Sequence, residues 1–331
     1  MNKPRVGMVG YFGWGNFGDE LFIRSHEQHL GSDYDLYVVN DLLEEPYFSK
    51  PVDDIVADTD AFIIGGGDLI NPLRISSLYW REEFLQKPTF VFGLGVPGQP
   101  FRRDNVLDFY SRFLNHENCK VVVARDVESY DWIKENLAVG DKLTWYPDPV
   151  CSVRRPDPVD TKGEKILGVT IREHRSLSED LSAVRALIDE AKNLGYRIKH
   201  IAMGTDSIGE ADLNRARSIA ESDEEVVGGT TLDDLCREIS SCSALATIKF
   251  HGMVIATMYG IPSIAMSVTP KNKNFLRMIE REEMACSYTD ASLPEKLSKY
   301  PARIHSRVRG NLYYRSKAGY DHLRSVMAEA L

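Results

Sequence analysis

Short apolar runs alternate with longer amphipathic segments along the first half of the chain. The apolar runs have the length of buried strands and lie at residues 6–9, 36–39, 61–64, 89–94 and 121–124. Between them, the spacing of apolar residues predicts helices over residues 19–30, 105–114 and 127–137. Parallel strands joined by helices give this alternation. The first half therefore predicts a doubly wound α/β domain, in which ligands bind at the carboxyl ends of the strands.

A proline-rich stretch separates this half from the second one. Four prolines fall between residues 146 and 160, a composition typical of a domain linker. The alternation then restarts, with strands predicted over 166–171, 198–203, 244–248 and 263–268 and helices over 181–194, 232–242 and 251–259. Thr231 and Asp234 have the spacing of a capping box at the start of one of these helices. We interpret the chain as two doubly wound, Rossmann-like domains, residues 1–155 and 156–331, facing a cleft.

Composition restricts the class of protein. Apolar residues make up 43% of the 331 residues and charged residues 27%, as is typical of a globular protein. No stretch approaches the ~18 consecutive apolar residues of a membrane-spanning helix, and the N-terminus lacks the pattern of a signal peptide. The net charge of -9 disfavours broad attraction to nucleic acid, so an anionic ligand requires a local basic cluster. Five cysteines without a C-x-x-C pair predict buried thiols in a cytoplasmic protein.

A glycine-rich loop follows the first predicted strand. Gly13, Gly15 and Gly18 form a G-x-G-x-x-G pattern, which can bind a dinucleotide. Here the pattern starts several residues after the strand and is interleaved with aromatic residues, so a plain tight turn and a sugar-contacting loop are also open. We favour the sugar-contacting loop, because aromatic rings stack on sugars while Asn16 and Asp19 can bind hydroxyl groups.

The main candidate for catalysis is the segment Lys249-Phe250-His251, where a predicted strand runs into a helix. The N-terminus of that helix presents free N–H groups to an anion. Lys249 and His251 can face the same site, and histidine has a pKa suited to a general acid. An ordinary structural histidine is the alternative.

Other cations lie where predicted strands end. Arg125 precedes the helix over 127–137 and offers a planar guanidinium to a carboxylate or a phosphate. Alternatively, Arg125 pairs with Asp126 or caps a neighbouring strand. Lys271 follows the strand over 263–268 and can reach the same anion, whereas Lys273 is as readily a solvated surface residue.

No metal site and no nucleophilic triad are predicted. His26 and His29 are three residues apart on a predicted helix, but no third ligand accompanies them, so we expect both at the surface. No serine occupies a G-x-S-x-G elbow.

Several motifs spread over the chain occur in the order found in one family of enzymes. They are Asn16 to Asp19, Gly65-Gly66-Gly67, residues 92–95, Arg125-Asp126 with Ser129, Pro147-Asp148-Pro149, and Lys249-Phe250-His251. On these motifs the sequence resembles the polysaccharide pyruvyl transferase family. The resemblance implies a GT-B-like fold and transfer of the pyruvate unit of phosphoenolpyruvate onto a sugar diol as a ketal, during synthesis of cell-surface polysaccharide or exopolysaccharide. One departure is Lys249, where many relatives carry arginine.

The resemblance also implies roles for individual residues. His251 would protonate the methylene carbon of phosphoenolpyruvate. The residues implied to bind phosphoenolpyruvate are Arg125, Lys249, Lys271 and Arg172. Those implied to bind the acceptor are Asn16, Asp19 and Asp68, with Asp19 or Asp68 as the base.

The same resemblance assigns the acceptor to the first domain and the donor to the second. The expected partners are phosphoenolpyruvate and a saccharide or lipid-linked oligosaccharide, with peripheral membrane contact through such an acceptor. No cofactor, metal ion or nucleic acid is expected. By analogy with GT-B proteins, the helix predicted over 306–331 crosses back onto the first domain.

Two other functions remain open from the sequence. A GT-B glycosyltransferase using a nucleotide sugar would share the fold, but the glutamate that commonly holds the ribose has no counterpart, since residues 249–266 contain no Glu or Asp. A sugar-binding protein that has lost catalysis is the non-enzymatic alternative, and the retained Lys249, His251 and Arg125 argue against it.

Overall fold

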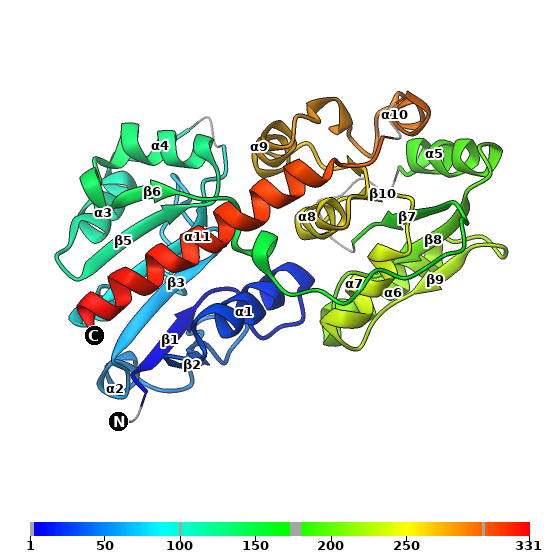
Figure 1. Cartoon of the computed structure of the whole chain (residues 1–331). Coiled ribbons are helices and arrows are strands. Elements are labelled where there is room, and N and C mark those ends of the chain that lie inside the picture. The colour runs from blue at the N-terminus through cyan, green and yellow to red at the C-terminus, as the bar shows by residue number, and fades with distance from the viewer. Residues whose placement is uncertain (1–2, 99–100, 173–179, 300–301) are drawn as a thin grey trace. The chain divides into compact units, whose positions relative to one another are not determined.

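The computed structural model describes residues 3–98, 101–172, 180–299 and 302–331. By its contacts the chain divides into two compact units. The first unit comprises the described residues of 1–13, 19–153 and 312–331, and the second comprises those of 14–18 and 154–311. Figure 1 traces the chain through both units.

The first unit is built on a parallel sheet in the order β2-β1-β3-β4-β5-β6. Its strands are β1 (Arg5–Val9), β2 (Asp35–Val38), β3 (Ala61–Asp68), β4 (Thr89–Gly95), β5 (Cys119–Ala124) and β6 (Leu143–Trp145). Its α-helices are α1 (Phe17–Leu30), α2 (Val52–Ala57), α3 (Asp104–Asn115), α4 (Val127–Leu137) and the greater part of α11 (Ser306–Ala330). Short 3-10 helices lie at η1 (Glu82–Gln86), η2 (Gly140–Lys142) and η3 (Pro149–Ser152).

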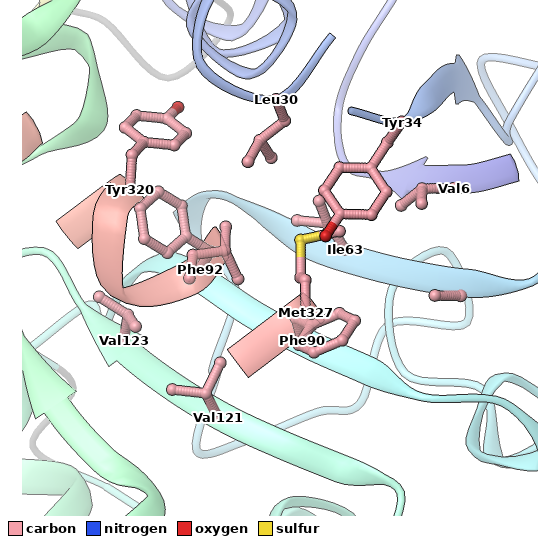
Figure 2. Packing of buried hydrophobic residues seen from close by; sticks show 12 residues of the cluster. Val6, Leu30, Tyr34, Ile63, Phe90, Phe92, Val121, Val123, Tyr320 and Met327 are labelled. Atoms are coloured by element: carbon pink, nitrogen blue, oxygen red, sulfur yellow. The ribbon is translucent and has the colours of Figure 1, made fainter. Parts of the chain in front are cut away.

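The last helix completes the core of this unit. Tyr320, Leu323 and Met327 of α11 are fully buried in a cluster with side chains of β3, β4 and β5, such as Phe90 and Phe92. Figure 2 shows Tyr320 beside Phe92 and Met327 beside Phe90. Burying a large apolar side chain stabilises a fold by roughly 1.5–3 kcal/mol, so the sheet of the first unit depends on this final segment of the chain.

The second unit is built on a parallel sheet in the order β11-β10-β7-β8-β9. Its strands are β7 (Ile166–Thr170), β8 (Arg197–Ile201), β9 (Glu225–Val227), β10 (Ala244–Thr247) and β11 (Ser263–Ala265). Its α-helices are α5 (Ser182–Asn193), α6 (Asp206–Ile219), α7 (Leu232–Ser240), α8 (Phe250–Tyr259), α9 (Pro270–Met278) and α10 (Leu293–Lys299), with the 3-10 helix η4 (Glu282–Met284).

These two parallel sheets confirm the predicted α/β class, and most predicted elements recur within one or two residues. The capping box at Thr231 is also confirmed, because its side chain accepts from the Asp234 amide and the Asp234 carboxylate accepts from the Thr231 amide. Gly260 ends α8 in the left-handed conformation, at φ 81°.

The structure corrects two predicted strand ends. The strand predicted over 61–64 continues through Gly65, Gly66 and Gly67, because β3 pairs with β4 as far as Asp68 opposite Gly95. The other strand was predicted too long: β11 ends at Ala265, and Pro270 opens α9. Proline suits the first turn of a helix because its missing N–H is not needed there.

The surface positions predicted for His26 and His29 are wrong. Their exposed fractions are 0% and 8%. The His26 Nδ1 lies 3.0 Å from the Tyr320 hydroxyl, and the His29 ring stacks on the Tyr320 ring with centroids 4.1 Å apart. Both histidines therefore face α11, an element that lies close to the other end of the sequence.

Candidate functional site

The second unit gathers predicted site residues at one edge of its sheet. Lys249, Arg172 and Lys271 follow the carboxyl ends of β10, β7 and β11, and β10 is paired with both of the other strands. Thr247 turns the chain at the end of β10, because its Oγ1 accepts a hydrogen bond from the Lys249 amide at 3.0 Å. Lys249 thus occupies the N-cap of α8, and His251 lies in the first turn.

Lys249 is engaged by its neighbours. Its Nζ lies 2.7 Å from the Asp212 carboxylate of α6 and donates to the Met203 carbonyl at 3.3 Å. The side chain of Asp212 is only 3% exposed. Asp212 had not been predicted as a site residue, because a single acid on an amphipathic helix carries no distinguishing signal. A buried ion pair therefore ties the N-terminus of α8 to α6.

His251 is half-buried and packs against the segment Trp14–Gly18 of the same unit. A Cβ built on Gly18 would lie 2.6 Å from Cγ and 2.8 Å from Cε1 of His251. Real Cβ atoms do not approach other atoms so closely, so the imidazole requires glycine at position 18. The Asn16–Asp19 motif thus contacts the Lys249–His251 motif directly.

The rest of this glycine segment pairs with the turn after β8. The Gly15 carbonyl accepts from the Thr205 amide at 2.7 Å, and Asn16 forms an antiparallel bridge with Gly204. A Cβ on Gly15 would come within 3.0 Å of Thr205 Oγ1, whereas one on Gly13 would meet nothing within 4 Å. Gly15 and Gly18 therefore permit close packing against Thr205 and His251, whereas Gly13 has open space beside it.

The remaining predicted cations of this unit differ in exposure. Lys271 lies in the first turn of α9 and is half-buried, with its Nζ 5.8 Å from the centre of the Phe250 ring. The Phe250 ring is in turn 4.9 Å from the His251 ring. Arg172 is exposed, two residues beyond β7, and Lys273 is exposed on α9.

The first unit holds a second group of predicted residues, centred on Arg125. The Arg125 side chain is 2% exposed, and its guanidinium contacts Asp68 directly, Asp126 at 4.0 Å and Asp148 at 3.8 Å. Burial acts to lower the pKa of Arg125, but the carboxylates, Asp68 foremost, outweigh burial and raise that pKa. One cation is thus surrounded by three acids.

Strand and helix ends position these acids. Asp68 ends β3 and has a side chain 22% exposed, so it is the most accessible of the three. Asp126 caps α4 by accepting from the Ser129 amide at 2.8 Å, and Asp148 accepts from the Val150 amide at 3.0 Å. Burial raises the pKa of Asp126 despite the adjacent Arg125. The sequence identified Arg125 and Asp68 separately, and the structure brings them into contact.

Asp19 is accompanied by two tyrosines. Burial and then the negative charge of Asp19 raise the pKa of Tyr11, and the same two causes raise the pKa of Tyr79. Both phenols therefore stay protonated and can donate hydrogen bonds. Tyr79 was missed by sequence reasoning, since it lies in an irregular segment with no motif.

A cluster of acids elsewhere is occupied by a lysine. Among the described residues, carboxylate oxygens of Glu221, Asp223 and Glu224 lie within 4.8 Å of one another. The Lys192 Nζ lies 3.0, 3.2 and 2.8 Å from these three carboxylates. The hydrogen bonds that the Lys192 ammonium donates to Glu224 and Glu221 raise the pKa of Lys192. The ammonium satisfies the acids, so this cluster provides no metal site.

Two further properties bear on the class of protein. All five cysteines are free thiols with buried side chains. Within the described part of the chain, no helix has both the length and the apolar character needed to cross a bilayer.

Comparison with solved structures defines the class first. The chain has a GT-B-like fold, with two parallel α/β units whose neighbours are GT-B glycosyltransferases and epimerases. An S. aureus MnaA structure with UDP is 9% identical, with a TM-score of 0.62 over 98% of this chain and 97% of that one. A putative UDP-N-acetylglucosamine 2-epimerase from Listeria monocytogenes is 11% identical, with a TM-score of 0.58 over 99% and 96%. Anabaena HepE, in complex with UDP and glucose, is 9% identical, with a TM-score of 0.51 over 98% of each chain.

Sequence comparison then gives the family. The chain belongs to the polysaccharide pyruvyl transferase family, whose model matches residues 16–270. The matched region contains both the Asn16–Asp19 and the Lys249–His251 motifs. No protein with a curated description matches the chain by sequence. Family membership supports a transferase that modifies polysaccharide.

Proposed function

We propose that the protein transfers the pyruvate unit of phosphoenolpyruvate onto two hydroxyls of a sugar, forming a ketal during synthesis of cell-surface or exported polysaccharide. One observation carries the proposal: His251, a histidine at a helix N-terminus, packs on Gly18 of the Asn16–Asp19 motif. The two motifs are far apart in sequence, and a shared site explains why both belong to one family pattern. The five free thiols support a cytoplasmic location, where phosphoenolpyruvate is made.

Phosphoenolpyruvate carries a carboxylate and a phosphate, so its site needs at least two cationic groups. In the second unit we assign this role to Lys249, Lys271 and Arg172, together with the N–H groups at the start of α8. Because Asp212 already balances Lys249, Lys271 and the helix amides should bind most of the phosphate charge. Arg125 of the first unit is the fourth residue proposed to bind phosphoenolpyruvate. Its contact with Asp68 gives it a second role, which is to hold the Asp68 carboxylate in place.

The proposed reaction needs one general acid. The protonated imidazole of His251 gives a proton to the methylene carbon of phosphoenolpyruvate, which becomes the methyl group and leaves the adjacent carbon electrophilic. One sugar hydroxyl attacks that carbon, phosphate leaves, and the second hydroxyl closes the ketal. Of the two hydroxyl protons released, one restores His251 and the other leaves with phosphate. No cofactor is needed.

The acceptor residues proposed are Asn16, Asp19 and Asp68. Asp68 and Asp19 each offer a carboxylate to a sugar hydroxyl, and the protonated phenols of Tyr11 and Tyr79 lie near Asp19. Such a mixture of aromatic rings and carboxylates is typical of a carbohydrate site. Replacing Asp19 and Asp68 separately by Asn tests which of them accepts the hydroxyl proton. Only replacement of the base should lower kcat with little change in KM.

The test is release of phosphate from phosphoenolpyruvate by purified protein, offered acceptors containing galactose, glucose, mannose or N-acetylmannosamine. Acceptor-dependent release with a gain of one pyruvyl mass is expected. His251→Ala should lower kcat by about 100-fold or more, whereas His305→Ala, at an exposed histidine of the same unit, should not. Turnover that is unchanged in His251→Ala would remove His251 from the mechanism.

A nucleotide-sugar glycosyltransferase is the second candidate, favoured by the UDP present in two of the similar structures. The absence of Glu and Asp from residues 249–266 argues against a ribose-binding acid there. Thermal stabilisation by UDP or a UDP-sugar, with no phosphate release from phosphoenolpyruvate across the acceptor panel, would favour this second function. Binding of sugar without either reaction would indicate a sugar-binding protein.

A further inference from the structure

An apolar and basic patch lies beyond the carboxyl ends of β3 and β4 in the first unit. It consists of Arg74, Ile75, Phe101, Arg102 and Arg103 and is called the Phe101 patch here. Phe101 is 72% exposed, the most exposed of the large apolar residues described, and Ile75 is 37% exposed. All three arginines are exposed. A single exposed apolar side chain is common, but here a second apolar residue and three arginines accompany the phenyl ring, and this combination indicates a contact surface.

Two segments are held side by side to form the patch. The Arg103 amide donates to the Pro72 carbonyl at 2.9 Å, and the Tyr110 hydroxyl of α3 donates to the Arg74 carbonyl at 3.0 Å. These bonds fix the backbone from which the exposed side chains project. The patch is therefore part of the folded unit and not a chance feature of one loop.

The charge of the patch is opposite to that of the whole chain. The chain carries a net charge of -9, yet residues 71–76 and 101–104 together contain three arginines and one acid, Asp104. Among the described residues, none of the three guanidinium groups lies within ion-pair distance of a carboxylate. Their charge is thus available to an external anionic surface.

We propose that the Phe101 patch binds the surface of an anionic lipid bilayer. An aromatic ring placed among arginines suits the interface of such a bilayer, where the ring enters the headgroup region and the guanidinium groups meet lipid phosphates. A stable interface with a folded protein takes about 20–30 residues from each partner, many more than the Phe101 patch contains.

The position of the patch gives this binding a purpose, which rests on the proposed function. Its two segments follow β3 and β4, whose last residues, Asp68 and Gly95, are paired neighbours. Asp68 is a proposed acceptor residue. Contact of this sheet edge with a bilayer would bring the acceptor residues to the membrane surface and select a lipid-linked acceptor over a free saccharide.

Binding is tested by co-sedimentation of the full chain with vesicles of phosphatidylglycerol in phosphatidylcholine, and with vesicles of phosphatidylcholine alone. We expect binding to the anionic vesicles that weakens as salt is raised. One arginine near an anionic surface changes the partition coefficient about five-fold, so Arg102→Gln/Arg103→Gln should lower it about 25-fold. At high salt, where the apolar contact dominates, Phe101→Ser should lower the partition coefficient more than the arginine substitutions do.

Matched variants separate the patch from general effects. Tyr314→Ser removes another exposed aromatic ring, 70% exposed on α11, and Arg185→Gln/Arg217→Gln removes the same charge from exposed positions in the second unit. Both should bind vesicles as the wild type does. Failure of the wild type to bind anionic vesicles, or equal loss in patch and control variants, would overturn the proposal. Because no turnover is measured, this outcome is independent of whether the protein is a pyruvyl transferase.

Discussion

Replacing Gly18 by alanine gives a direct test of the contact between the Asn16–Asp19 motif and His251. The added Cβ would lie 2.6 Å from Cγ of the imidazole, against the 3.4 Å at which ordinary van der Waals contact begins. The Nδ1 atom of the ring would lie closer still. The ring must therefore retreat by at least about 1 Å, because protein interiors are too closely packed to absorb the overlap elsewhere. A displacement of about 1 Å can lower the rate of a catalysed reaction about 100-fold. We expect a loss of that size in kcat for phosphoenolpyruvate-dependent phosphate release.

The control for this variant lies in the segment just before α1. Gly13 has a positive φ of 85°, which Gly18 in α1 does not share, and a Cβ on Gly13 would meet nothing within 4 Å. Gly13→Ala should therefore cost about 1–2 kcal/mol of backbone strain and leave kcat close to the wild-type value. Turnover that falls equally in both variants would show that the reaction responds to any side chain added near the start of α1, and not specifically to the position of His251.

A double-mutant cycle tests the same contact without relying on any activity. Overpacking a well-packed site costs about 1–3 kcal/mol, so Gly18→Ala should lower the free energy of unfolding by about that amount. In a His251→Ala background the ring is gone, and most of this cost should disappear. Urea denaturation of the four proteins gives the coupling free energy. A coupling of zero would refute the contact between Gly18 and His251.

Two other predictions concern buried charge. Lys249→Met should destabilise the protein by about 3 kcal/mol in urea denaturation, because it removes the cation beside the buried Asp212 carboxylate; Lys249→Arg should retain most of the stability, and equal losses in both would contradict the ion pair. His26 has its pKa lowered from 6.5 to about 3, first by burial and then by His29. The unfolded chain therefore binds a proton that the folded chain excludes, so stability is full above pH 6.5 and falls as the pH drops towards 3. Protonation of His26 alone should lower the free energy of unfolding by about 2 kcal/mol between about pH 7 and about pH 5. His26→Gln should therefore flatten this part of the pH profile of stability.

The fold could be predicted because its strands are short apolar runs and its helices have one apolar face. Helix α4 was predicted at its observed bounds, Val127–Leu137, since Asp126 caps its start and the apolar spacing sets its length. Pairing between strands is not encoded in such local patterns. This is why the strand was predicted to end at residue 64, although pairing with β4 keeps Gly65 to Gly67 in β3.

The candidate site could be predicted only as separate motifs. Lys249, His251 and Arg125 were identified by residue type at strand ends, and pairing of Arg125 with Asp126 was one alternative considered, but the acid that balances Lys249 was not identified. Asp212 lies on a helix distant in sequence from Lys249, and Asp148 had appeared only as part of a family motif. The burial of His26 was equally hidden, because Tyr320 comes from the last helix. Contacts between distant segments decide burial and charge balance, and no local pattern reports them.

The lysine at position 249 changes how the donor can be held. An ammonium group has three N–H donors, and the contacts with Asp212 and the Met203 carbonyl use two of them. One donor is left for a ligand, which suits a single phosphate oxygen and not the two-point grip on a carboxylate that arginine provides. If phosphoenolpyruvate is the donor, as proposed, its carboxylate must be bound by another group, and guanidinium is the side chain whose shape matches a carboxylate. Under the proposed function, the exposed Arg172 of the second unit is therefore the residue on which selection of phosphoenolpyruvate over other phosphate esters should depend, while Lys271 contributes mainly charge.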